Sequence, residues 1–400
     1  METTVDNICT RLGDLIKTTL SPLIPGDYIL LDLPYYANIG DILIWQGTED
    51  FLTTLPGKCL GKHSKETFDF RPLPIDCTIL LQGGGNFGDI WRKHQEFRLK
   101  TIRHYPANPI IVLPQTIHYN SHEVLLEDVQ EMNLHSRMTI CARDTHSAEI
   151  LRKTGFTGRL LTLPDMAFCI RQDTIRTNMT EPTKEKLLLL REDKELKKSS
   201  NLTISDWPHL HESSDEAWKY LTKHTGSEAD TFFLDDFFPR EIKEGITFAS
   251  SFKEAYSTRL HFAILRLLLG LPIKMADNSY GKNLDFYNTW LKDSELASLP
   301  DEEELAAIEL AASVYRQKQA DFGKCKQEYE ALIAAQRDKQ REFDILHAET
   351  ERRQEEKIAA LRAETEWEKQ KHRKYKRLFS VTLIAMLLSI VALVTIILNI

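Results

Sequence analysis

The chain has 400 residues, a hydrophobic fraction of 42% and a formal net charge of −8 at pH 7. This length is too great for one small core and predicts two globular lobes with additional segments. The acidic balance argues against a nucleic-acid partner. The six cysteines form no Cys-x-x-Cys pair, and neither they nor the histidines show a spacing typical of metal ligands, so no metal site is expected.

Short apolar runs recur through the first part of the chain and predict parallel β-strands. Amphipathic stretches such as "DILIWQGTEDFL" (41–52) follow some of these runs and predict helices. The alternation of the two favours an α/β fold, with helices covering both faces of a parallel sheet. The predicted strands are 28–33, 77–82, 109–114, 138–143 and 159–164.

The loop after the first predicted strand carries Asn38, Gly40 and Asp41, directly before a helical stretch. Because this loop would lie at the carboxyl edge of the sheet, its polar side chains are candidates for ligand binding. The alternative for Asp41 is a purely structural role as the cap of the following helix.

The second predicted strand leads into "QGGGNFGDIW" (82–91), which contains a Gly-x-Gly-x-x-Gly sequence. Gly84 and Gly85 let the backbone approach a ligand, and N–H groups before a helix can hold an anion. Asn86 and Asp89 repeat the Asn-x-Gly-Asp spacing of the earlier loop, so we expect both loops to line one cleft. A dinucleotide is not favoured, because no acidic residue ends the next strand to hold a ribose.

A second set of apolar segments begins after the polar stretch 175–185 and predicts a second lobe. Arg191 ends the first strand of this set, and Arg259 and His261 stand just before a strongly apolar helix. Guanidinium groups bind carboxylate or phosphate bidentately, and histidine exchanges a proton near neutral pH. The alternative is an arginine that bonds a neighbouring carbonyl and a histidine packed in the core.

The region from 301 to 377 is rich in Glu, Lys, Arg, Gln and Ala, and it predicts a long helix. Ile308, Tyr315 and Phe322 recur every seven residues, which favours a coiled-coil stalk that forms homo-oligomers. A single solvated helix acting as a spacer is the alternative, because lysines interrupt the second apolar seam.

The segment 378–398 contains no charged residue, proline or glycine and would span roughly 30 Å as a helix. A basic block, "KQKHRKYKR" (369–377), precedes it. These features predict a transmembrane helix that anchors the chain by its C-terminal tail to the cytoplasmic face of the cell membrane. The predicted domains are thus an N-terminal Rossmann-like lobe (1–180), a C-terminal Rossmann-like lobe (181–300), the stalk (301–377) and the transmembrane helix (378–398).

Seven short motifs, taken in their order along the chain, resemble the polysaccharide pyruvyl transferase family. The resemblance covers roughly residues 28–290 and implies two Rossmann-like lobes of the GT-B type. The motifs are "NIGDILIWQG" (38–47), "QGGGNFGDIW" (82–91), "LPQTI" (113–117), "ARDTHSAEIL" (142–151), "LPDMAF" (163–168), "LLREDKE" (189–195) and "STRLHFAIL" (257–265).

The resemblance implies an enzyme that transfers the enolpyruvyl group of phosphoenolpyruvate to a sugar and forms a pyruvate ketal. The setting would be exopolysaccharide or cell-surface glycan synthesis, with a sugar or lipid-linked oligosaccharide acceptor and no cofactor. It also implies that Arg259, Leu260 and His261 work at the phosphoenolpyruvate site. The arginine of the strand-end motif maps to Arg191, and the acidic residue of the glycine loop maps to Asp89.

Chemistry supports a specific hypothesis for these residues. His261 would donate a proton to the methylene carbon, and Asp89 would orient or deprotonate a sugar hydroxyl. Arg191 and Arg259 would stabilise the departing phosphate. The substrate-binding residues expected besides these arginines are Leu260, Asn38, Asp41, Gly84, Gly85 and Asn86.

Two other classes of function remain as alternatives. A glycosyltransferase that uses a nucleotide sugar would share the architecture and the anion-friendly loops. An inactive membrane-anchored scaffold would use only the stalk and the anchor, but it would have no need for clustered arginine and histidine. An NAD-dependent oxidoreductase is disfavoured by the missing acidic residue.

Overall fold

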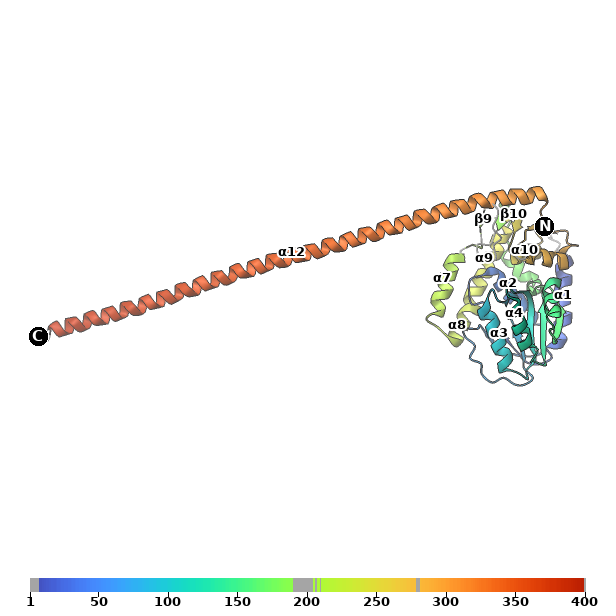
Figure 1. Ribbon diagram of the computed structural model, residues 1–400, viewed down its shortest axis with the longest axis horizontal. Helices are drawn as coiled ribbons and strands as arrows, with labels where there is room; N and C mark the ends of the chain where they lie inside the picture. The colour runs from blue at the N-terminus through green and yellow to red at the C-terminus, as the bar shows by residue number, and fades with distance from the viewer. Residues whose placement is uncertain (1–6, 190–203, 206, 209, 278–280, 399–400) are drawn as a thin grey trace. The chain divides into compact units, whose positions relative to one another are not determined.

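The computed structural model describes residues 7–189, 204–205, 207–208, 210–277 and 281–398 (Figure 1). Residues 1–317 form one compact unit, and residues 318–400 form a second. The strands and all helices but the greater part of the last lie in the first unit.

The first sheet has seven parallel strands in the order β2-β1-β3-β5-β6-β7, with β4 paired to β5. The five predicted runs form strands β1, β3, β5, β6 and β7, and β2 and β4 are additional. The strand bounds are β1 Tyr28–Leu31, β2 Cys59–His63, β3 Thr78–Leu81, β4 Gly84–Gly88, β5 Ile110–His118, β6 Met138–Ala142 and β7 Arg159–Thr162.

The central strands of this sheet are buried on both faces, which explains their unbroken apolar sequences. Side chains alternate between the faces. Ile79 and Leu81 belong to one apolar cluster, and Leu80 belongs to the other. The covering helices are α1 (Asn7–Leu20), α2 (Ile39–Leu52), α3 (Arg92–His104), α4 (His122–Met132), α5 (Thr145–Lys153) and α6 (Gln172–Asn178), joined by the short 3₁₀ helices η1 (Ser21–Leu23) and η2 (Met166–Cys169).

The second sheet has five parallel strands in the order β12-β11-β10-β8-β9. Its strands are β8 (Lys184–Leu189), β9 (Ile204–Ser205), β10 (Phe252–Ser257), β11 (Ile273–Met275) and β12 (Ala297–Ser298). Its helices are α7 (Leu210–Leu221), α8 (Gly226–Phe232), α9 (Phe238–Ser250), α10 (Leu260–Leu268) and α11 (Lys282–Phe286), with π-helical turns η3 (Phe233–Phe237) and η4 (Tyr287–Leu291).

One apolar cluster joins the two sheets. It contains Leu80 from the first sheet, Leu187 from the second, and apolar residues of α2, α9 and α10. Helices α2 and α10 are apolar over most of their surface and contact each other, so they are buried between the sheets. The expected α/β fold with parallel sheets is present, and both sheets belong to one compact unit. The arrangement as two GT-B-like lobes stays a prediction. The boundaries predicted at 180, 300 and 377 stay predictions.

The glycine-rich sequence does not form the expected loop between a strand and a helix. It forms strand β4, in which Gly84 pairs with Gln115 and Gly88 pairs with His118. Gly84 and Gly88 have φ values of +136° and +129°, a region that favours glycine. A Cβ atom on Gly88 would lie 1.8 Å from the carbonyl oxygen of His118. The glycines are therefore needed in part for close strand pairing.

The C-terminal part of the chain is a single long helix, α12 (Glu302–Leu398), as predicted. In the first unit Glu304 holds its start, accepting hydrogen bonds from Tyr256 Oη at 3.0 Å and from Lys274. Farther along, Arg352 donates to Glu356 at 3.1 Å, four residues on. Such pairs stabilise a solvated helix. Self-association of the stalk stays a prediction.

The prediction of a membrane-spanning helix is contradicted. Within the part of the chain that the structure describes, no helix combines the length and apolar character needed to cross a bilayer. This finding contradicts the predicted transmembrane helix at 378–398. It also contradicts the predicted single-pass tail anchor at the cytoplasmic face of the cell membrane.

Candidate functional site

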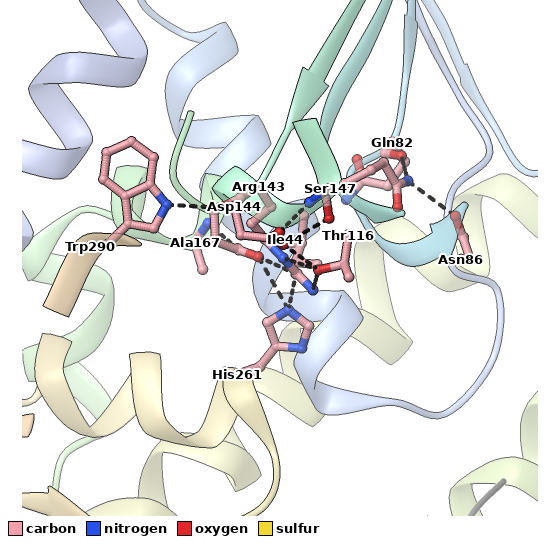
Figure 2. Close-up of polar contacts among 12 residues, drawn as sticks. Ile44, Gln82, Asn86, Thr116, Arg143, Asp144, Ser147, Ala167, His261 and Trp290 are labelled. Carbon is pink, nitrogen blue, oxygen red and sulfur yellow. Dashed lines mark hydrogen bonds and ion pairs between the residues drawn. The ribbon is translucent and has the colours of Figure 1, made fainter. Parts of the chain in front are cut away.

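A buried polar cluster joins residues that lie far apart in the sequence (Figure 2). Arg143 follows strand β6, Asp165 follows β7, and His261 is the second residue of α10. The carboxyl ends of β6 and β7 lie at the same edge of the first sheet, where ligands of open parallel sheets bind. Helix α10 brings His261 to this edge from the second sheet.

Arg143 is the centre of this cluster and is fully buried. Its Nη1 atom donates to Asp165 Oδ2 at 2.6 Å and lies 3.1 Å from His261 Nε2. Its Nε and Nη2 atoms donate to Thr116 Oγ1 at 3.1 and 2.8 Å. Asp165 also accepts from the backbone N–H of Ala167 at 2.9 Å. The guanidinium is therefore fixed from several sides, and it orients the imidazole.

The charges of the cluster shift the pKa of two members. Burial raises the pKa of Asp165, but Arg143 and His261 outweigh that effect, and the net result is a pKa well below the usual range. Burial lowers the pKa of His261 below its ordinary value of 6.5, although Asp165, 3.3 Å from Nε2, acts in the opposite direction. Without a bound ligand, His261 is thus held as the neutral imidazole at pH 7.

The loop before α2 contacts this cluster. Asn38, rather than Asp41, caps the helix, accepting from the backbone N–H of Gly40 at 3.0 Å. Asp41 Oδ2 accepts from Tyr36 Oη at 3.0 Å and from Asn38 Nδ2 at 2.8 Å. A Cβ atom on Gly40 would lie 2.5 Å from His261 Nδ1. The loop thus positions Asp41 and packs directly on the imidazole.

The start of strand β4 lies beside the same groups. A Cβ atom on Gly84 would lie 3.7 Å from Asp41 Oδ1. A Cβ atom on Gly85 would lie 3.2 Å from Lys282 Nζ and 3.8 Å from Arg143 Nη2. Two cationic side chains therefore flank one glycine. Partly buried backbone between clustered cations is suited to binding an anion with carboxylate or phosphate groups.

Lys282 adds positive charge to this region, and Arg259 lies two residues before His261. Lys282 lies at the start of α11 and is only 4% exposed. Arg259 is the N-cap residue of α10, and its backbone N–H donates to Ser257 Oγ at 2.9 Å. Leu260 is buried in the apolar core, so it holds α10 in place and offers no polar group to a ligand.

The structure brings together only part of the predicted site. Asp89 lies in a different setting, where its carboxylate accepts from the backbone N–H groups of Asn120 and Ser121 just before α4. Asn86 Oδ1 accepts from Arg98 at 3.0 Å and from Gln115 at 3.1 Å. Arg191 lies outside the described residues.

Sequence reasoning missed three members of the cluster. Arg143 and Asp165 lie in the motifs "ARDTHSAEIL" and "LPDMAF", but neither motif indicated a chemical role. The usable signal would have been an arginine directly after a buried strand, together with an aspartate three residues after the next strand. Lys282 had no signal, because it lies in a polar stretch between short elements.

The stability of the ligand-free protein should depend on pH through His261. The unfolded chain takes up a proton near pH 6.5, whereas the folded chain does so only at lower pH. The free energy of unfolding should therefore fall as the pH is lowered from about 7 to 5, because the unfolded state binds more protons. Denaturant unfolding at several pH values should show that His261→Gln flattens this slope. Protonation of Asp165 lowers the free energy of unfolding only below about pH 4. The effects of His261 and Asp165 can therefore be measured separately.

The sequence of residues 38–273 matches the family described as polysaccharide pyruvyl transferase. The match identifies the class to which this α/β protein belongs. The chain belongs to the polysaccharide pyruvyl transferase family.

Curated relatives agree with this assignment. EpsO of Bacillus subtilis (strain 168), named as a candidate pyruvyl transferase, is 29% identical over 280 residues, which cover 67% of this chain and 86% of the relative. Pyruvyl transferase 1 of Schizosaccharomyces pombe is 28% identical over 287 residues, covering 66% of this chain and 69% of the relative. General stress protein 30 of Bacillus subtilis is 25% identical over 295 residues, covering 70% and 82%.

A solved structure shares the fold. It is a protein of uncharacterised function from Klebsiella pneumoniae, with a TM-score of 0.51 and 18% sequence identity. The likeness covers 74% of this chain and 99% of that one. At this identity it supports the fold alone.

Proposed function

We propose that this chain transfers the enolpyruvyl group of phosphoenolpyruvate to two hydroxyl groups of a sugar in a polysaccharide precursor, forming a pyruvate ketal. Membership of the family makes the protein a transferase. The observation that carries the proposal is that Arg143 and Lys282 meet at the backbone of Gly85, with His261 Nε2 3.1 Å from Arg143 Nη1. Phosphoenolpyruvate has a carboxylate and a phosphate, and it needs such clustered cations.

The donor would bind with its anionic groups against Arg143 and Lys282, with Arg259 as a further cation. Its negative charges would raise the pKa of the nearby imidazole, so that His261 becomes protonated when the donor binds. The imidazolium then gives its proton to the methylene carbon, and positive charge develops at the adjacent carbon. Attack by the sugar oxygens and departure of phosphate complete the ketal.

Phosphate release tests this proposal directly. Purified protein is incubated with phosphoenolpyruvate and with either a free oligosaccharide or its lipid-linked form, and phosphate and product mass are measured. We expect release that requires both donor and acceptor, and the two acceptor forms distinguish a lipid-linked precursor from a soluble one. Stabilisation by a nucleotide sugar, with no response to phosphoenolpyruvate in thermal unfolding, would contradict the proposal and favour a glycosyltransferase.

Substitution of Gly40 tests the position of the imidazole. In Gly40→Ala the new methyl group would lie 2.5 Å from Nδ1 and 2.9 Å from Cβ of His261, so the ring must move. We expect turnover to fall on the order of 100-fold, because misplacement of a catalytic group by about 1 Å has effects of this size. Gly26→Ala is the matched control, since a Cβ atom there meets nothing within 4 Å. Equal turnover of the two variants would show that the contact does not position His261.

A further inference from the structure

A second buried polar cluster lies at the carboxyl end of β1 and holds a histidine that the donor chemistry does not use. His94, in the first turn of α3, places Nδ1 2.7 Å from Asp32 Oδ1. Asp32 is almost fully buried, and Arg98 Nη2 lies 3.5 Å from its other carboxylate oxygen.

The backbone at this cluster is strained. Asp32 has a φ of +66° and is one of two residues other than glycine with positive φ in the described part of the chain. Such strain persists where the surroundings require it, and it gathers at functional sites. The conformation turns the end of β1 so that the Asp32 carboxylate meets His94.

The geometry leaves one imidazole nitrogen available. The bond from Nδ1–H to a carboxylate fixes the tautomer in which Nε2 carries a lone pair. Among the described residues, no group forms a hydrogen bond with His94 Nε2. The His94 side chain is 10% exposed. This is the arrangement of a general base held by an aspartate.

The cluster connects to the donor site through a short chain of contacts. The ring of Tyr36 meets the ring of His94 edge-on, with centroids 5.9 Å apart, and Tyr36 Oη donates to Asp41 at 3.0 Å. Asp41 in turn lies beside Gly84. Tyr36 and Asp41 are partly exposed, so a ligand next to the donor has access to this surface.

A buried amide supports a polar ligand here. Gln82, at the end of β3, is 2% exposed, and neither of its side-chain amide atoms has a hydrogen-bond partner among the described residues. The backbone carbonyl oxygen of Gln82 accepts from Gln115 Nε2, which also donates to Asn86, and Figure 2 shows Gln82 near Asn86. A ring with several hydroxyl groups could supply the donors and acceptors that such buried groups require.

We propose that this cluster forms the acceptor subsite for a sugar and that His94, positioned by Asp32, is the base for an acceptor hydroxyl. The inference rests on the proposed function and extends it. After His261 protonates the methylene carbon, the first hydroxyl proton moves to Nε2 of His94, and the oxygen's electron pair forms a bond to the carbon that carries the phosphate. The bond from this carbon to the phosphate oxygen then breaks and leaves its electron pair on phosphate. The second sugar oxygen bonds to the same carbon, and phosphate takes the proton of that second hydroxyl. His94 then releases its proton to solvent.

Three variants test the inference, with turnover measured across pH at saturating donor and donor affinity measured by thermal unfolding. His94→Gln removes the base, and Asp32→Asn removes its orienting charge while keeping a residue that tolerates positive φ. His135→Gln is the matched control, because His135 is equally buried and bonds only the backbone, at Tyr105 and Arg137. The groups that face His94 are Asp32 from β1, Tyr36 from the loop before α2 and Arg98 from α3, which contacts Asp32.

We expect His94→Gln to lower turnover by on the order of 10²- to 10⁴-fold with unchanged donor affinity. The fall in rate at acid pH, where the base is protonated, should disappear in His94→Gln and shift in Asp32→Asn. His135→Gln should keep the wild-type profile. Wild-type turnover and an unchanged acid limb in His94→Gln would overturn the inference and leave the proposed function intact.

Two further outcomes are decisive. If His94→Gln does not fold, the profile of Asp32→Asn decides, and an unchanged acid limb overturns the inference. If the wild-type protein shows no turnover that depends on phosphoenolpyruvate and acceptor, the proposed function fails, and the acceptor base fails with it.

Discussion

Replacing His261 with glutamine should abolish turnover while the protein keeps its fold. In the proposed mechanism His261 supplies the proton to carbon, and glutamine cannot do so. Loss of a general acid costs about 10²- to 10⁴-fold in rate. Phosphate release measures the loss, and thermal unfolding confirms that the variant is folded.

The binding of phosphoenolpyruvate separates a chemical role from a binding role for His261. Glutamine can still bond Arg143, and Arg143, Arg259 and Lys282 remain to hold the donor. We therefore expect the variant to bind phosphoenolpyruvate but not to turn it over. Wild-type turnover would remove His261 from the mechanism.

Replacing Arg143 with alanine should destabilise the protein strongly. Arg143 and Asp165 are both fully buried, and their ion pair has a length of 2.6 Å. Removing the cation leaves a carboxylate buried without its charge partner, which costs about 3–5 kcal/mol. Urea unfolding should show this loss at neutral pH. A variant as stable as the wild type would contradict the structure of this cluster.

The matched variant Arg143→Lys keeps the charge and loses the geometry. Lysine has a single ammonium group and cannot bond Asp165, Thr116 and His261 from one planar fork. We expect a smaller loss of stability than in Arg143→Ala, but turnover close to that of His261→Gln. In the double variant Arg143→Ala/Asp165→Ala the losses should be less than additive, because no buried charge is left unpaired.

Strands that are continuous apolar runs could be predicted from the sequence. The five strands of the first sheet begin within one residue of their predicted positions, because each is a continuous apolar run flanked by turn residues. Strands β2 and β4 were missed. The sequence of β2 is "CLGKH" and that of β4 is "GGNFG", and neither has the β-branched residues that indicate a strand.

Some residues of the candidate site could also be predicted from the sequence, and others could not. His261, Asp41 and Gly85 were identified because their residue types and their places beside predicted elements are suggestive. Asp89 shares those properties, yet its carboxylate bonds the backbone before α4. The spacing of residues in the sequence cannot distinguish a carboxylate that faces a ligand from one that bonds the backbone of a loop. The difference depends on the direction in which the side chain points from the backbone.

The sequence by itself determined the α/β class, the long C-terminal helix and the family, since each depends on local composition or on motifs in a fixed order. Only the tertiary structure showed that Arg143 and Asp165 contact His261, that Lys282 lies with Arg143 beside Gly85, and that Asp32 holds His94. These residues come from different parts of the chain, and Arg143 and His261, for example, are 118 positions apart. Their meeting depends on the order of strands in the sheets and on the packing of α2 against α10, and no local pattern in the sequence records either.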